Sequence, residues 1–191
     1  MKQSLSVALG LSGLLVLAGC AADAPEESVE QVLAVAEGCT PSGAEVESIA
    51  ISGEFGATPS VTFDAPLSAV VTQRSVIIEG DGPEVQDGDI LSIDYSLYNA
   101  STGDLIEESG YTEVSPTVLT LDTDAPNFVG VSLTAACSTV GSRVAGLIPP
   151  LEAFGPDGAP EFGLGAGESL IFIVDVVEIK PPPAPPLDRI E

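Results

Sequence analysis

The stretch that decides the fold reads Gly88-Asp89-Ile90-Leu91-Ser92-Ile93-Asp94-Tyr95-Ser96-Leu97-Tyr98. Apolar side chains stand at every second position from Leu91 to Leu97, and small or charged polar ones stand between them. This two-residue period is that of a β-strand with one buried and one solvated face. The stretch therefore predicts a half-buried strand.

Further strands are predicted on both sides of this one. Residues 169–179 are β-branched and aromatic, which favours a more deeply buried strand. Turn residues separate the remaining candidates, and Val131–Ser138 is the single helix candidate, closed by Val140-Gly141. Several antiparallel strands with one short helix predict an α+β fold in which the sheet wraps the helix. The other candidate strands are Val46–Ile51, Val61–Phe63, Ser75–Glu79, Thr117–Leu121 and Arg143–Ile148.

The first 19 residues predict a lipoprotein signal peptide. Lys2 precedes an apolar run, Leu5–Leu17, that is shorter than the about 20 residues needed to cross a bilayer. Leu17-Ala18-Gly19-Cys20 then matches a lipobox, so we expect the mature chain to start at a lipidated Cys20. The alternative is an ordinary secretory signal with a chance cysteine. Either way, the protein is expected outside the cytoplasm, and a lipid would anchor it to the membrane.

The rest of the chain divides into a tether, one domain and a tail. Residues 20–43 are acidic and contain proline, which is typical of a solvated tether, and the folded unit is expected over residues 44–180. Residues 181–191 begin Pro-Pro-Pro-Ala-Pro-Pro and predict an extended proline-rich tail. Cys39, near the end of the tether, and Cys137 in the domain form an even pair that predicts a disulfide; two separate buried thiols are the alternative.

Composition excludes several kinds of partner and chemistry. The chain has 29 acidic residues against 5 Lys plus Arg and a net charge of -24, so nucleic acid is not an expected partner. Apolar residues make up 45% of it, which argues against a disordered acidic chain. It has no histidine and no CxxC motif, so we expect neither a metal site nor a thiol nucleophile, and no cofactor.

From Gly80 to Ile179 the order of motifs resembles the FKBP-type peptidyl-prolyl isomerases. The resemblance rests on five pieces in the family's order and spacing, and residues 52–63 look like the lead-in of secreted bacterial members. It implies an FKBP-like antiparallel sheet around one short helix. The pieces are Gly88–Tyr95, Gly103-Asp104-Leu105-Ile106-Glu107-Glu108-Ser109, Val140-Gly141-Ser142-Arg143, Ile148-Pro149-Pro150 with Phe154-Gly155, and Leu170–Val176.

The resemblance also implies a pocket for a proline ring. Phe128 would supply a backbone N–H to the substrate carbonyl, and Val131 replaces a floor residue that is often tryptophan. Phe154 stands where the family often has tyrosine, and it cannot donate a hydrogen bond. The region Thr117–Leu119 lacks an expected phenylalanine. The implied pocket residues are Tyr95, Glu107, Phe128, Phe154 and Phe172 as catalytic residues, and Ile106 and Val131 as substrate-binding residues.

Three functions are compatible with the sequence. The first is a peptidyl-prolyl isomerase, somewhat weakened, that assists folding of proline-containing unfolded or nascent polypeptides outside the membrane. The second is a non-catalytic FKBP-like chaperone or binding module that prefers basic segments. The third is a surface spacer, in which the aromatic residues only pack the core.

Overall fold

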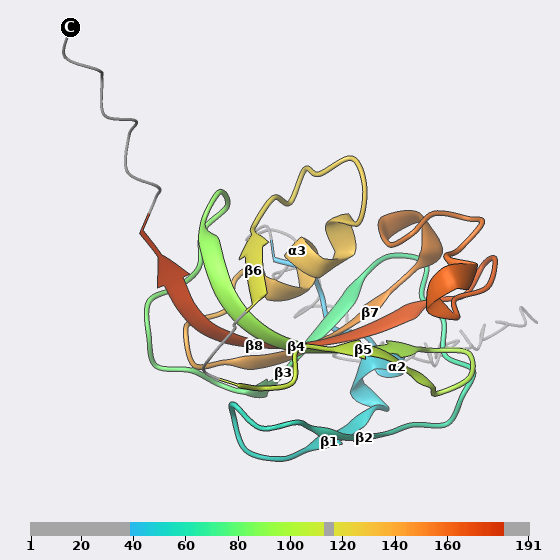
Figure 1. Cartoon of the computed structure of the whole chain (residues 1–191), viewed down its shortest axis with the longest axis horizontal. Helices are drawn as coiled ribbons and strands as arrows, with labels where there is room; N and C mark the ends of the chain where they lie inside the picture. Colours follow the sequence, from blue (N-terminus) through green and yellow to red (C-terminus); the bar gives the residue numbers. More distant parts are fainter. Residues whose placement is uncertain (1–38, 113–116, 182–191) are drawn as a thin grey trace, which may run out of the picture.

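A mostly antiparallel sheet forms the body of the molecule (Figure 1). The computed structural model describes residues 39–112 and 117–181. Along the sheet the order is β3-β7-β8-β4-β5. The strand β6 pairs with the same edge of β4 as β5 does, but at the beginning of β4, whereas β5 pairs near its end. The α+β fold class is thereby confirmed. The strands are β3 (Gln73–Ile78), β4 (Ile90–Asn99), β5 (Leu105–Glu108), β6 (Thr117–Thr120), β7 (Arg143–Ile148) and β8 (Leu170–Lys180).

One face of the sheet curves around the helix α3 (Val129–Ala135), as Figure 1 shows. The helix begins two residues before and ends three residues before the stretch that the sequence predicts. Leu91, Ile93 and Leu97 of β4 point toward this side and are buried with Val131. Gly146 on β7 lets the helix approach closely, because a Cβ atom there would collide with the side chain of Thr134.

A second layer covers the opposite face of the sheet, below it in Figure 1. It consists of α2 (Ala44–Glu47) and the hairpin of β1 (Ala50–Ser52) and β2 (Ser60–Thr62). Its side chains pack on Leu147, Ile171 and Ile173. The predicted strand Val46–Ile51 is therefore wrong in its first half, which is helical. Val46 and Ile49 are three residues apart, so one helical turn buries both on the same face.

The predicted solvated face of β4 is also wrong. Ser92, Asp94 and Ser96 are only 1%, 8% and 0% exposed. The β1–β2 layer and Tyr111 cover them: Tyr111 shares a hydrogen bond of 2.9 Å with Ser96, and Ser109 donates one of the same length to Asp94. Asp94 and Ser96 are thus buried together with hydrogen-bond partners, and the strand keeps its alternation while both of its faces are covered.

A buried ion pair fixes the β1–β2 loop to the sheet. Arg143 on β7 donates two hydrogen bonds to Asp175 on β8, at 2.6 and 2.7 Å, and both side chains are fully buried. The same guanidinium donates to the carbonyl oxygens of Gly53 and Ala57, and the N–H of Gly56 donates to Asp175 at 2.7 Å. All of the partners belong to one network, so the charges are buried without being left unpaired.

The first described residues are held against the domain. A disulfide joins Cys39 to Cys137, which follows α3. The hydroxyl of Thr40 donates to the carbonyl of Leu133 at 2.8 Å, and the backbone N–H of Arg74 donates to the carbonyl of Pro41 at 3.0 Å. No helix among residues 39–112 and 117–181 is long and apolar enough to cross a membrane. The predicted signal peptide, Cys20 and residues 182–191 lie outside the described residues.

Candidate functional site

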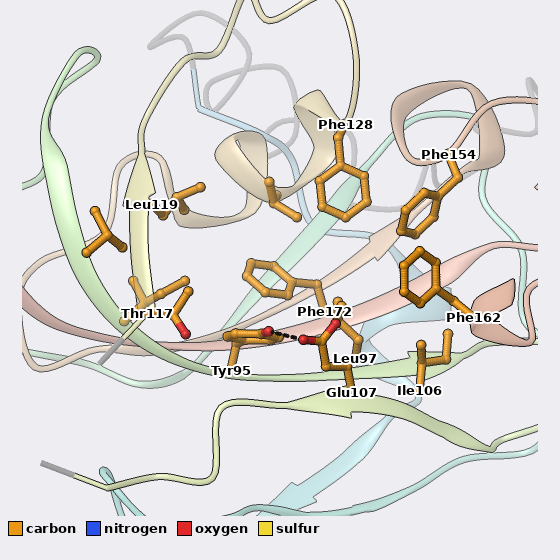
Figure 2. A pocket seen from close by; sticks show the side chains of 13 residues that line it. Tyr95, Leu97, Ile106, Glu107, Thr117, Leu119, Phe128, Phe154, Phe162 and Phe172 are labelled. Atoms are coloured by element: carbon orange, nitrogen blue, oxygen red, sulfur yellow. Dashed lines mark hydrogen bonds between the residues drawn. The ribbon is translucent and has the colours of Figure 1, made fainter. Parts of the chain in front are cut away.

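An apolar cavity of about 330 Å³ lies between the sheet and α3 (Figure 2). The structure brings all of the predicted pocket residues together around it, although they come from β4, β5, α3, β8 and the β7–β8 connection. The long strand β4 contributes the alternate residues Ile93, Tyr95 and Leu97, as its two-residue period requires, whereas the short strands β5 and β6 border the cavity with adjacent residues. The cavity is lined by Ile93, Tyr95, Leu97, Ile106, Glu107, Thr117, Val118, Leu119, Phe128, Val131, Phe154, Phe162 and Phe172.

Tyr95 and Phe172 form the wall on the sheet. Tyr95 lies on β4 and Phe172 on β8, and their ring centroids are 6.1 Å apart with the rings tilted by 46°. Phe172 is 3% exposed and belongs to the core as well as to the wall. The register opposes Phe172 to Leu97, so two neighbouring strands build this side of the pocket as one rigid surface.

A hydrogen bond fixes the polar end of this wall. The hydroxyl of Tyr95 donates to Oε1 of Glu107 on β5 at 2.9 Å, drawn as the dashed line in Figure 2. Burial, and then the hydrogen bond and charge of Glu107, raise the pKa of Tyr95 to about 12. The phenol therefore stays neutral at physiological pH. Among the described residues that line the cavity, Glu107 is the one carboxylate.

Three phenylalanines make the opposite wall, which Figure 2 shows facing the pocket from above and from the right. The rings of Phe128 and Phe154 have centroids 4.7 Å apart, and those of Phe154 and Phe162 are stacked at 5.7 Å. Phe154 is 36% and Phe162 48% exposed, so this wall is open to solvent. Such offset and tilted ring pairs are each favourable by about 0.5–1.5 kcal/mol beyond their buried area.

Sequence reasoning missed Phe162. It ends the 3₁₀ helix η2 (Pro160–Phe162) in the long connection between β7 and β8, after the first 3₁₀ helix η1 (Pro150–Glu152). The available signal was a second aromatic residue, after Phe154, in a connection rich in Gly, Pro and acidic residues. An exposed aromatic residue in such a loop favours a binding role, because loops set on a rigid scaffold commonly carry function.

The entrance also carries a backbone donor. Phe128 is the N-cap of α3, in the left-handed conformation with φ 56° and ψ 30°. Its N–H precedes the hydrogen bonds of the helix, and no described residue accepts a hydrogen bond from it. The site thus has a donor beside an apolar cavity.

The remaining walls are aliphatic. Val131 forms the floor below α3, and Thr117, Val118 and Leu119 of β6 line the side where the sequence lacks a phenylalanine. Among the described residues no group of three or more His, Cys, Asp or Glu side chains could hold a metal ion. What the arrangement can do is bind a compact apolar ring and hold an adjoining carbonyl.

The fold is similar to that of proteins whose structures are solved. No protein-family model and no curated protein matches the sequence. Among solved structures, the N-terminal domain of FKBP42 from Arabidopsis thaliana superposes with a TM-score of 0.53 at 19% identity, over 65% of this chain and 98% of its own. The chain has the FKBP fold.

Two further structures are similar. FkpA from Escherichia coli is 27% identical and matches 59% of this chain and 49% of its own, with a TM-score of 0.49. A peptidyl-prolyl cis-trans isomerase from Pseudomonas syringae pv. tomato is 16% identical and matches 84% of this chain and 99% of its own, with the same TM-score. The layer that α2, β1 and β2 add lies on the face of the sheet opposite the pocket, so it leaves the pocket of the FKBP fold open.

Proposed function

We propose that the protein is a peptidyl-prolyl cis–trans isomerase that acts on unfolded or nascent polypeptides outside the cytoplasmic membrane. The observation that carries the proposal is the cavity of about 330 Å³, which is walled by Tyr95, Phe172 and three further phenylalanines. It is apolar and open, and the backbone N–H of Phe128, one of its lining residues, has no acceptor among the described residues. A domain that served only as a spacer would have no reason to leave such a cavity unfilled.

The chemistry needs no covalent step. Rotation about an amide bond has a barrier of about 18–20 kcal/mol, and uncatalysed exchange at X-Pro bonds takes tens to hundreds of seconds. Burying the proline ring among Tyr95, Phe128 and Phe172 favours the twisted amide, because twisting removes conjugation and makes the group less polar. The Phe128 N–H holds one carbonyl while the acyl group of the X-Pro bond turns.

The missing hydroxyl at position 154 gives the first test. We expect Phe154→Tyr to raise kcat/KM on a Leu-Pro peptide by about 2- to 10-fold, the worth of one added hydrogen bond of about 0.5–1.5 kcal/mol. Tyr95→Phe, which removes the donor to Glu107, should lower it by a similar factor. NMR exchange spectroscopy of the peptide, or a protease-coupled assay, measures both.

Phe55→Tyr is the matched control for the first variant. Phe55 is 36% exposed, as Phe154 is, but it lies in the β1–β2 loop on the other side of the sheet. The Phe55→Tyr variant should therefore isomerise the peptide at the same rate as the wild type. Phe172→Ala is a poorer test, because its side chain is 3% exposed and its loss also removes core packing. Wild-type protein that folds but does not accelerate exchange would contradict the isomerase proposal.

One observation favours a second candidate, a non-catalytic binding module. Phe154 has no hydrogen-bond donor in its side chain. Of the three described basic side chains, Arg143 is fully buried and Arg74 largely buried, so only Lys180 lies at the surface. A protein with such an acidic surface and an open apolar pocket suits basic unfolded segments. Peptides that bind without any acceleration of their cis–trans exchange would support this second function over the isomerase.

The location of the protein is tested separately. We propose a lipid anchor at Cys20, supported by Leu17-Ala18-Gly19-Cys20 after a short apolar run. In detergent phase separation the wild type is expected in the detergent phase and Cys20→Ala in the aqueous phase, because two acyl chains give stable anchoring. If both proteins partition into the aqueous phase, the anchor is refuted and the isomerase proposal is untouched.

A further inference from the structure

A second hollow adjoins the pocket on the far side of the Phe128–Phe154 ring pair. It measures about 280 Å³ and is lined by Asn127, Phe128, Leu151, Ala153, Phe154 and Gly155. Phe128 and Phe154 line both cavities, so their ring pair, with centroids 4.7 Å apart, is the ridge between them. A polypeptide that leaves the pocket across this ridge enters the second hollow.

Leu151 is presented to the second hollow by a fixed backbone. It is 79% exposed and sits in η1, where the N–H of Gly155 donates to the carbonyl of Pro150 at 2.7 Å. The next side chain, Glu152, accepts hydrogen bonds from the N–H and the hydroxyl of Thr72 at 2.9 and 2.6 Å. With its neighbours anchored in this way, Leu151 extends an apolar surface that already includes the exposed rings of Phe154 and Phe162.

The direction of the bound chain follows from the donor at the ridge. During isomerisation the acyl carbonyl of the X-Pro bond rotates, so a fixed donor on that carbonyl would oppose the motion. The N–H of Phe128 is therefore suited to the proline's own carbonyl, which does not have to turn. The residues after the proline then lie over Phe128 and reach the second hollow.

Charge restricts what can bind there. None of the described residues that line the second hollow is ionisable, and the chain carries a net charge of -24. The surrounding field repels acidic segments, and Leu151, Phe154 and Phe128 give the hollow an apolar lining on which Asn127 is the uncharged polar side chain.

We propose that the second hollow binds an apolar side chain one or two residues after the prolyl residue of a client polypeptide. This rests on the isomerase function proposed above and adds a preference to it. The protein would then select prolines that are followed by apolar residues, and Leu151 would be a specificity residue rather than a catalytic one.

The test compares two peptides that differ only after the proline, Ala-Leu-Pro-Leu-Leu-Lys and Ala-Leu-Pro-Gly-Gly-Lys. From the burial of an apolar side chain, wild type is expected to favour the first by about 5- to 10-fold in kcat/KM, and Leu151→Ala to reduce that preference by about 3-fold. Leu105→Ala is the matched control: Leu105 is 49% exposed on β5 and lines neither cavity, so the preference should stay unchanged. Exchange NMR on the full-length protein gives all the rates.

Two failures can be told apart. If wild type catalyses both peptides equally, or if Leu151→Ala keeps the full preference, the second hollow is not a client site and the isomerase function stands. If neither peptide is accelerated by protein that melts cooperatively, the isomerase function and this inference both fall.

Discussion

Replacing Cys39 and Cys137 with serine should lower the free energy of unfolding by about 4–5 kcal/mol, the largest effect expected for this domain. The disulfide joins residues 98 positions apart, and a cross-link that closes so long a loop removes much of the freedom of the unfolded chain. Part of that loss also comes from Thr40 and Pro41, whose hydrogen bonds to the domain depend on the anchored segment. Urea denaturation of the double variant against wild type measures the difference.

Reduction of the wild type provides the control for this experiment. Dithiothreitol should shift the wild-type midpoint toward that of the double variant and leave the double variant unchanged. A difference below about 1 kcal/mol between wild type and double variant would mean that the unfolded chain gains little freedom, and the loop-closure account would then be wrong.

The second large effect is expected at the buried ion pair. Arg143→Met removes the guanidinium and leaves the carboxylate of Asp175, which is fully buried, with only the N–H of Gly56 as a partner. Breaking a buried pair in this way costs about 3–5 kcal/mol. The β1–β2 loop should also loosen, because the carbonyls of Gly53 and Ala57 lose their donor. Urea denaturation gives the energy, and limited proteolysis between residues 52 and 60 reports on the loop.

The double variant Arg143→Met with Asp175→Leu separates charge from packing. Replacing both charges by apolar groups is often neutral, so the double variant should recover most of the stability that the single variant loses. The hydrogen bonds from Arg143 to Gly53 and Ala57 are lost in both variants, and the double variant also loses the one from Gly56 to Asp175, so the proteolysis result should not recover. A double variant no more stable than Arg143→Met would show that the loop contacts, not the unpaired charge, carry the cost.

The parts of the fold that local sequence controls could be predicted. β7 coincides with its predicted range, and β8 is shifted by one residue. β8 is rich in β-branched residues, which favour strands. The short strand β5 was not predicted, since four residues carry too few repeats to show a period. α2 was partly misread as a strand for the same reason, because Val46 is the one buried residue within its four.

The parts that depend on distant partners could not be predicted from periodicity. The polar face of β4 is buried because Arg143, Asp175 and Tyr111 come together between the sheet and the β1–β2 layer. The residues next to Ser96 in the sequence give no sign of these contacts. In the pocket, the residues taken from the family's motifs lie together, whereas Phe162 lies in a loop whose path only the structure reveals. The exposure of Leu151 could not be predicted from the sequence either, because it depends on the hydrogen bonds that Thr72 donates to the neighbouring Glu152.

The bond between Cys39 and Cys137 also decides how the domain responds to mechanical tension. A pull applied to the chain ahead of Cys39 passes through the sulfur atoms to Cys137 and continues from there toward β8. The residues between the two cysteines, which include β4, Tyr95 and Phe128, form a closed loop that bears no load along its covalent backbone. Within the described domain, only the chain from Cys137 to Lys180 can lengthen under such a force. A domain held at its N-terminal end could thus be stretched without drawing out β4, the strand that gives the pocket Ile93, Tyr95 and Leu97.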